Sequence, residues 1–165
     1  MTTTAYQGTY FAIRLDKHGN EFVQARENEV LIVPLNTENE VILTIEPSPA
    51  FDETALILPG GSIEPDEAME VTAARELQEE IGYAPGRLTY LGELRPSTKY
   101  FTTRSFVYLG RDLTPSSLQG DEDYEIAQER IPLATFEQLI ATGRLTDARV
   151  IAALYMARAF LQAEQ

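Results

Sequence analysis

The 165-residue sequence contains no cysteine and a single histidine, His18. The absence of cysteine excludes disulfides, thiolate nucleophiles and sulfur-ligated metals, and one histidine all but excludes a Ser-His or multi-histidine site. The longest apolar run, 150–157, is too short to span a bilayer. Basic residues are also few: 13 Lys and Arg against 26 Asp and Glu give a net charge of -13. This charge argues against nucleic acid or an acidic membrane as a partner, because both would be repelled.

The composition of the sequence predicts one globular domain that covers residues 1–165. Hydrophobic residues make up 44% of the chain and charged residues 24%, and neither a repeat nor a linker divides it. The first residues have neither the basic region nor the apolar region of a signal peptide. We therefore expect a cytoplasmic location, and chemistry carried by carboxylates, hydroxyls, Arg, Lys or a bound ion.

The order of apolar runs and turn signals predicts an α/β fold. A helical pattern covers 67–81 and ends at Gly82, another covers 136–142, and a final helix follows Thr146 as its N-cap. Strands before and between these helices predict a helix-sheet-helix sandwich with a mixed β-sheet. The predicted strands are 9–15, 21–26, 30–34, 41–45, 54–58, 88–94, 103–109 and a short one near 131.

One face of the helix predicted at 67–81 carries a cluster of like charges. Glu76, Glu79 and Glu80 stand at positions i, i+3 and i+4 and therefore share a side of the helix. Their repulsion costs helix stability, and a divalent cation would remove that penalty. Because all available ligands are oxygens, the predicted ion is Mg²⁺, with Mn²⁺ as a substitute. The residues predicted to bury the opposite face are Val71, Ala74, Leu77 and Ile81.

An acidic helix face is most often simply solvated, so the interpretation depends on the spacing of its neighbours. Gly61, five residues, Glu67, seven residues and then "RELQEEIGY" fit the pattern G-x5-E-x7-R-E-U-x-E-E-x-G-U, in which U is apolar. The sole departure is Tyr83 in the last apolar position. On these residues the sequence resembles the Nudix family of nucleoside diphosphate-linked hydrolases. The resemblance implies a loop-helix-loop motif that cleaves a phosphoanhydride bond.

The resemblance also implies which residues hold the metal. Glu76 and Glu80 would be direct ligands, joined by the backbone carbonyl of Gly60, and Glu67 would complete the outer shell. The two glycines at 60 and 61 are consistent with a close approach of backbone to an ion.

The catalytic base is implied less sharply. Glu79 would be either a further metal ligand or the base that activates water, held in place by Arg75. In the resembled proteins a Glu of a late loop often has this role. The stretch "QGDEDYEIA" offers Glu122, Asp123 and Glu125. We favour Glu122, with Glu125 second.

Outside the signature, "LILPGGSIE", the late acidic loop and the terminal helix are similar to the branch of ADP-ribose pyrophosphatases and ADP-compound hydrolases. This similarity implies hydrolysis of ADP-ribose, or a related ADP-linked compound, to AMP and a phosphorylated product. The sequence departs from the branch at residues 46–48, which contain no Arg, and at Pro96, which lies nearer to the signature than the proline of many members.

Other functions and ligand contacts stay open. Another nucleoside diphosphate derivative, such as a dinucleoside polyphosphate, NADH or a modified nucleotide, would suit the same motif. A non-catalytic domain that senses nucleotides would suit it less well. Arg95, Lys99 and Arg104 follow the signature and are candidates for binding phosphate oxygens, with strand-edge or surface roles as the alternative. Tyr100 and Phe101 would stack on a base, although for Phe101 we expect burial in a sheet.

Homodimers formed by exchange of N-terminal strands are common in the resembled branch. The strand predicted at 9–15 would otherwise be an unprotected edge. We therefore expect a homodimer with residues 1–35 in its interface. The expected ligand is a nucleoside diphosphate-linked small molecule, with no nucleic acid and no membrane as partner.

Overall fold

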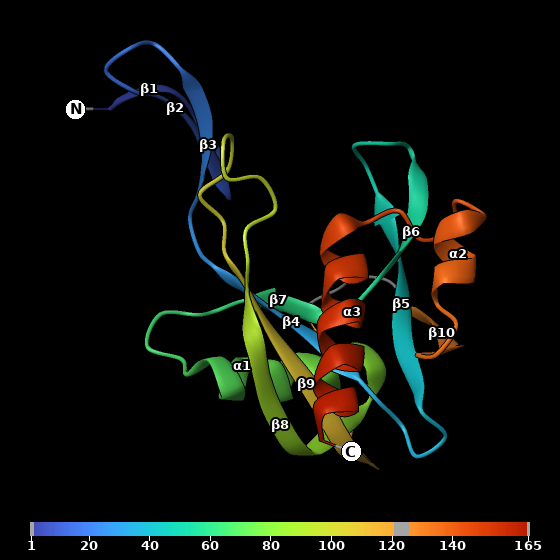
Figure 1. Cartoon of the computed structure of the whole chain (residues 1–165). Coiled ribbons are helices and arrows are strands. Elements are labelled where there is room, and N and C mark those ends of the chain that lie inside the picture. The colour runs from blue at the N-terminus through green and yellow to red at the C-terminus, as the bar shows by residue number, and fades with distance from the viewer. Residues whose placement is uncertain (1, 121–125, 165) are drawn as a thin grey trace.

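The structure, a computed structural model, describes residues 2–120 and 126–164. Strands predominate in this part of the chain, and the helices pack against them (Figure 1). Among these residues, no helix is long and apolar enough to cross a membrane. In chain order the elements are β1 (Thr3–Gln7), β2 (Phe11–Leu15), β3 (Glu21–Ala25), β4 (Glu29–Pro34), β5 (Glu40–Ser48), β6 (Glu53–Ile57), β7 (Gly60–Ser62), α1 (Met69–Glu76), the π-helix η1 (Leu77–Ile81), β8 (Tyr83–Leu94), β9 (Ser105–Pro115), β10 (Ala127–Pro132), α2 (Glu137–Ala141) and α3 (Ala148–Ala163).

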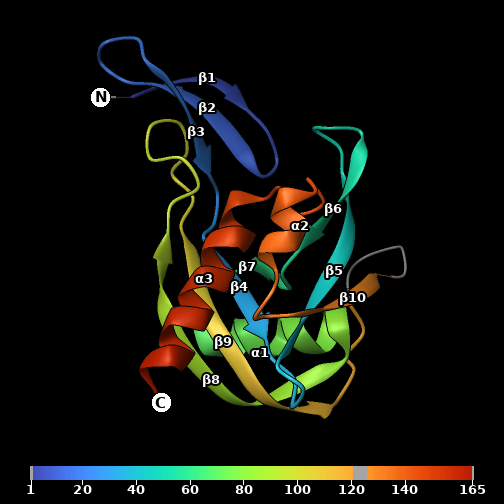
Figure 2. The same ribbon diagram turned by 45° about the vertical axis from the view of Figure 1, so that its right-hand side comes forward.

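A four-stranded sheet in the order β7-β4-β9-β8 lies at the centre of the molecule. Strands β4 and β9 are parallel and the other pairs are antiparallel, so the sheet is mixed. Helix α1 and η1 cover one face, while α3 and a second sheet, in the order β10-β5-β6, cover the other (Figures 1 and 2). This arrangement confirms the predicted α/β sandwich.

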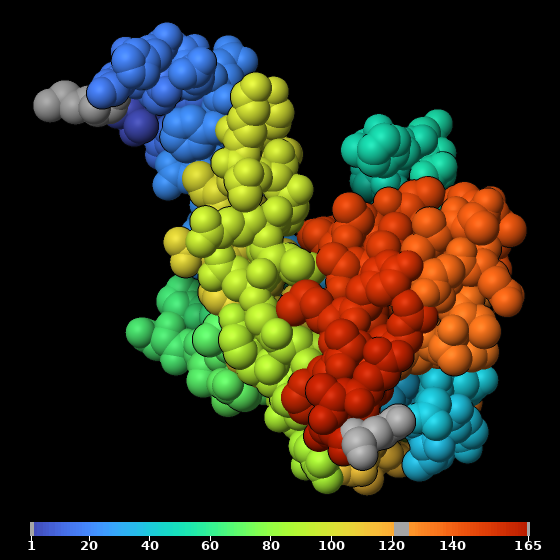
Figure 3. Space-filling model, viewed as in Figure 1, coloured from blue at the N-terminus to red at the C-terminus, as the bar shows by residue number. Residues whose placement is uncertain are grey.

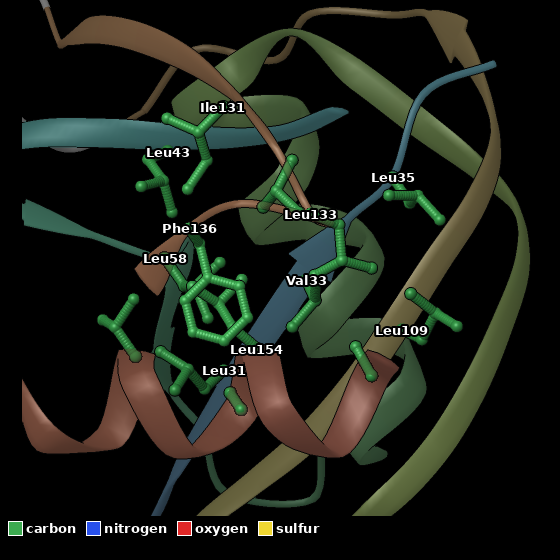
Figure 4. Close-up of a cluster of buried hydrophobic side chains, with 14 of the residues drawn as sticks. Leu31, Val33, Leu35, Leu43, Leu58, Leu109, Ile131, Leu133, Phe136 and Leu154 are labelled. Carbon is green, nitrogen blue, oxygen red and sulfur yellow. The ribbon is translucent and has the colours of Figure 1, made fainter. Parts of the chain in front are cut away.

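Strand β4 contributes to the hydrophobic cores on both faces of the central sheet. Leu31 and Val33 belong to the cluster that packs against α3, which Figure 4 shows, whereas Val30 and Ile32 pack with Leu77 of η1. Successive side chains of a strand point to opposite faces, so a strand covered on both sides must be apolar at every position. The uninterrupted run at 30–33 therefore marks the central strand.

The helix of the signature differs from the prediction in its start, its end and its buried face. It begins at Met69 rather than at residue 67, and its last turn is the π-helix η1. Val71, predicted to be buried, is 58% exposed, whereas Thr72 and Ala73 are fully buried. The hydroxyl of Thr72 donates to the Glu67 carboxylate over 2.9 Å, and this satisfied hydrogen bond lets a polar residue face the core.

The last helix begins after Asp147, not after Thr146 as predicted. The Asp147 carboxylate accepts hydrogen bonds from the backbone N–H groups of Arg149 at 2.7 Å and Val150 at 3.3 Å, which are unpaired donors of the first turn. The predicted apolar stripe of this helix is confirmed. Val150, Leu154 and Ala157 are buried, and Leu161 is partly buried.

The N-terminal strands form a separate three-stranded sheet in the order β1-β2-β3. This sheet stands out from the body of the molecule, beside the segment that links β8 to β9 (Figures 1 and 3). The strand predicted at 9–15 corresponds to β2, which pairs with β1 and β3. The prediction that it is an unprotected edge is therefore wrong, because the unforeseen β1 covers it and itself forms the exposed edge.

The two faces of the signature helix predict different sensitivities to truncation. We expect Leu77→Ala to lower the free energy of unfolding by about 2–5 kcal/mol, because it leaves a cavity in a fully buried site. Val71→Ala, the matched control on the exposed side, should change it by less than about 0.5 kcal/mol. Urea unfolding followed by circular dichroism measures both. Equal losses for the two variants would contradict the assigned buried face.

Candidate active site

The signature begins where two glycines bring the backbone against β4 and against a carboxylate. Gly60 and Gly61 in β7 lie opposite Leu31 and Val30 of β4. A Cβ atom at Gly60 would overlap the Val30 carbonyl oxygen, and one at Gly61 would overlap the Glu76 carboxylate. Only residues without a side chain allow this close approach.

The carboxylates of the signature gather around Arg75. Its Nη1 atom lies 2.8 Å from Glu76 Oε1 and 2.8 Å from Glu79 Oε2, and its Nε atom lies 3.1 Å from Glu67 Oε1. The hydrogen bond from Arg75 holds the pKa of Glu67 below its ordinary value, and the same bond raises the pKa of Arg75. The cluster is thus held together by one permanently charged guanidinium.

The last two carboxylates of the signature lie in the π-helical turn. Glu79 and Glu80 belong to η1, which ends at Gly82 in the left-handed conformation with φ 76°. Glu80 Oε2 accepts a hydrogen bond from the Gly60 backbone N–H at 3.1 Å and so joins the helix to β7. π-helical turns occur often at functional sites. The sequence pattern, which predicted a continuous α-helix, contained no signal for this turn.

A cavity of about 620 Å³ opens beside the signature. Glu76 and Glu80 line it together with Gly60 and Gly61, whereas Glu79 is not among its lining residues. Its other walls come from the N-terminal sheet, the segment after β8 and the start of α3. The structure therefore brings two of the predicted metal ligands and the Gly60 backbone to one cavity.

The wall away from the signature is aromatic. Tyr10, Phe11 and Phe101 line the cavity and are 74%, 52% and 45% exposed. The expectation that Phe101 is buried in a sheet is wrong. Its backbone forms an isolated bridge with Val23 of β3, and its side chain stays 45% exposed at the cavity. Tyr100, the other candidate for stacking, is half exposed beneath the Lys99 ammonium, 5.2 Å from the ring centre.

The three basic residues predicted to bind phosphate lie outside the lining of this cavity. Arg95 Nε and Arg104 Nη1 lie 2.7 Å and 3.7 Å from the Glu93 carboxylate, and Lys99 lies over Tyr100. Pro96, from the same segment, does line the cavity.

The basic side chains that do line the cavity are Arg26, Arg75 and Arg149. Sequence reasoning missed Arg26 and Arg149, because nothing in a single sequence places β3 or the start of α3 beside the signature. The predicted late-loop residues Glu122, Asp123 and Glu125 lie outside the described residues.

Arg149 is fixed to the cavity wall by two acidic residues. Its Nη2 donates to Asp147 Oδ2 at 2.9 Å and its Nη1 to Glu29 Oε1 at 2.8 Å. Burial opposes the charge of Arg149, but the bonds to Asp147 and Glu29 outweigh burial and raise its pKa. Burial likewise works to raise the pKa of Asp147, yet its bonds to Arg149 leave it lowered. Both groups are therefore charged at neutral pH.

The residues of the signature suit a hard divalent cation in their chemistry. Among the described residues, no three acidic or histidine side chains already converge on one point, and Arg75 lies between Glu76 and Glu79. The predicted ligands that line the cavity nevertheless all offer oxygen: the carboxylates of Glu76 and Glu80 and the backbone carbonyl of Gly60, which has no side chain to shield it. Oxygen donors beside an open cavity fit Mg²⁺, which shares its ligand shell with substrate phosphates.

Comparison with known proteins identifies the architecture. The model of the NUDIX domain matches residues 25–154. The chain belongs to the Nudix family. The ADP compounds hydrolase NudE of Escherichia coli (strain K12) is 33% identical over 135 residues, which are 82% of this chain and 72% of that protein. The ADP-ribose pyrophosphatase of Bacillus subtilis (strain 168) is 25% identical over 127 residues, 76% of this chain and 69% of that protein.

A solved structure shows the same fold over nearly the whole chain. The crystal structure of an ADP compounds hydrolase superposes with a TM-score of 0.86 and 29% identity, covering 99% of this chain and 93% of that one. The family assignment confirms the resemblance predicted from the signature, and with it an enzyme of the Nudix pyrophosphatase type.

The pairing of Glu67 with Arg75 predicts a pH dependence of stability. The pKa of Glu67 lies below its ordinary value of 4.5, so the ionised pair stabilises the folded state above pH 4.5 and is lost as the pH falls through the lowered pKa. In chelator, Glu67→Gln should therefore be less stable than the parent by a constant amount at neutral pH, and the gap should narrow below pH 4.5. Urea unfolding across pH 3–7 tests this, with the exposed Glu53→Gln as control. A gap that widens in acid would contradict the pairing.

Proposed function

We propose that the protein hydrolyses the pyrophosphate bond of ADP-ribose or a related ADP-linked compound in a Mg²⁺-dependent reaction, giving AMP and a phosphorylated product. The observation that carries this proposal is the cavity in which Glu76, Glu80 and the backbone of Gly60 meet an aromatic wall. The acidic edge of the cavity suits a diphosphate bound together with a metal ion, and the exposed aromatic rings suit stacking on a nucleobase. The relatives whose names specify ADP compounds and ADP-ribose support the same substrate class.

Glu76, Glu80 and the carbonyl of Gly60 would hold the ion, with Glu79 as a further candidate ligand. When bound, Mg²⁺ supplies the positive charge that lets an anionic diphosphate enter a carboxylate-lined cavity, and it polarises the phosphoryl oxygens. The protein itself has to keep two of these carboxylates close together before the ion arrives. Arg75 does this by its contacts to Glu76 and Glu79.

Glu79 is our proposed general base among the described residues. It would accept a proton from the attacking water as the new bond from oxygen to phosphorus forms and the anhydride bond breaks. The phosphate that is not attacked, either AMP or the phosphorylated product, leaves with the bridging oxygen. The 2.8 Å contact from Arg75 fixes its carboxylate. Glu122 and Glu125 stay alternative candidates for this role.

The roles of the basic residues follow from their positions. Arg26 and Arg149 line the cavity and are better placed for substrate contact than Arg95, Lys99 and Arg104. The last three stay candidates for phosphate only if substrate extends along the segment after β8. A dinucleoside polyphosphate, NADH or a modified nucleotide is the alternative substrate class, and a substrate panel separates it from ADP-ribose.

The reaction is tested by product analysis and one substitution. With ADP-ribose and Mg²⁺ we expect stoichiometric AMP and ribose 5-phosphate, and no turnover in excess chelator. Glu80→Gln, which keeps the side chain's shape, should lower kcat/KM by at least about 100-fold, since a ligand carboxylate is lost. Glu53→Gln should behave as the parent. Full activity of Glu80→Gln, or hydrolysis in chelator, would rule out the proposed metal site.

We also propose a cytoplasmic homodimer. The cysteine-free sequence suits a reducing compartment. The N-terminal sheet stands apart from the body (Figure 3). It exposes large apolar side chains, and such surfaces often mark interfaces. Those outside the cavity lining include Tyr6 and Ile13, which are 61% and 38% exposed.

The dimer predicts twice the chain's mass in sedimentation or light scattering. The double substitution Tyr6→Ser and Ile13→Ser should shift the protein to monomer at micromolar concentration, because it removes apolar contacts from the proposed interface. Phe51→Ser is the matched control, since Phe51 is 77% exposed on the turn between β5 and β6. A monomeric parent protein would refute the proposal.

A further inference from the structure

A pair of oppositely charged side chains, Arg149 and Glu29, lies on the cavity wall and has no part in the signature. Both line the cavity and both are partly buried, with side chains 33% and 24% exposed. Their 2.8 Å contact joins the first turn of α3 to the start of β4, residues 120 positions apart in the chain. Asp147 and Ser105 hold the pair from behind, and neither lines the cavity.

The pair still has hydrogen-bonding capacity to offer a ligand. Of the five N–H donors of an arginine, three are engaged within the described part of the chain, two by Asp147 and one by Glu29. Glu29 Oε1 accepts from both Ser105 and Arg149, whereas Oε2 has no hydrogen-bond partner among the described residues. Two donors and one acceptor are thus available side by side at a cavity wall.

The position of the pair relative to the signature is set by the sheet. In the register of β4 with β7, Glu29 lies opposite Ser62, and Leu31 lies opposite Gly60. Glu29 is therefore two residues along the strand from the Gly60 position, a distance of roughly 7 Å. A single sugar ring bridges such a separation between a phosphate and a hydroxyl group.

The charge of the site favours a neutral ligand group over an anion. Asp147 and Glu29 together outweigh the charge of Arg149, so a phosphate placed here would meet a net negative site. A hydroxyl group both donates and accepts, and two adjacent hydroxyls can engage a carboxylate and a guanidinium at once. The chemistry that matches this wall is a vicinal diol.

We propose that Arg149 and Glu29 bind the vicinal diol of a ribose in the substrate and so select ribose-bearing diphosphates. The proposal rests on the proposed function. In ADP-ribose the diol has two sources, the ribose of adenosine and the terminal ribose. Both present the same pair of hydroxyls, and the test distinguishes them.

The test compares three substrates in the full-length protein with Mg²⁺. They are ADP-ribose, its 2′,3′-dideoxyadenosine analogue and the β-methyl ester of ADP, which lacks the terminal ribose. For Arg149→Met we expect KM for ADP-ribose to rise by about 10- to 100-fold, the value of a hydrogen bond to a charged group, with a smaller change in kcat. One of the two analogues lacks the diol that binds at this wall, and for that analogue Arg149→Met and the parent should have the same KM. The analogue for which the two KM values agree identifies the ribose that is bound.

Two further variants separate binding from folding. Arg158→Met makes the same change elsewhere on α3, at a residue paired with Glu137, and should leave all KM values unchanged. Glu29→Gln keeps the shape and packing of the side chain, and we expect it to raise KM for the same substrates as Arg149→Met does. It therefore replaces Arg149→Met in the test if that variant folds poorly. A parallel rise in KM for all three substrates, or no rise at all, would overturn the diol site alone. A parent protein that hydrolyses none of them would overturn the proposed function and the diol site together.

Discussion

The contacts of Arg75 are the interaction on which the site depends. Three carboxylates, Glu67, Glu76 and Glu79, lie within 3.1 Å of its guanidinium nitrogens. Without a cation these groups would repel one another across a few ångströms in a partly buried environment, where charges interact strongly. Arginine suits this position because its planar group offers several donors in fixed directions and stays charged at all relevant pH values. The helix can therefore carry a high density of acid and still fold before a metal binds.

The backbone near Gly60 also constrains the carboxylates of the signature. Glu76 faces Gly61 so closely that a methyl group would displace it, and Glu80 bonds to the N–H of Gly60. The carboxylates are therefore aligned with β7 as well as with one another. Since β7 pairs with β4, which is apolar on both faces, the site is anchored to the most buried strand of the fold. Packing of the core and placement of the acidic groups are consequently parts of one arrangement.

The sequence was sufficient to predict what depends on local spacing. The signature identified the family, and β-branched runs located the central strands. The sequence was insufficient where tertiary contacts determine which residues are buried, where a strand begins and which side chains meet. Val71 and Thr72 are adjacent, and the sheet rather than hydrophobicity determines which is buried. Strand β8 begins at Tyr83, earlier than predicted, because it stays paired with β9 as far as Pro115. Glu29 and Arg149 meet across most of the chain, so no local pattern could join them.

The strong negative charge of the protein makes the composition of the cavity significant. An anionic substrate approaching a chain of net charge -13 needs local compensation, and the described basic residues at the cavity are already paired with acids. The charges of Arg75 and Arg149 are thus largely balanced by the carboxylates that contact them. Aromatic faces and contacts to hydroxyl groups can then recognise the organic parts of the substrate, because these interactions need no further positive charge on the protein. In the proposed function the ion would carry the electrostatic attraction, while the protein's own side chains would determine which diphosphate is bound.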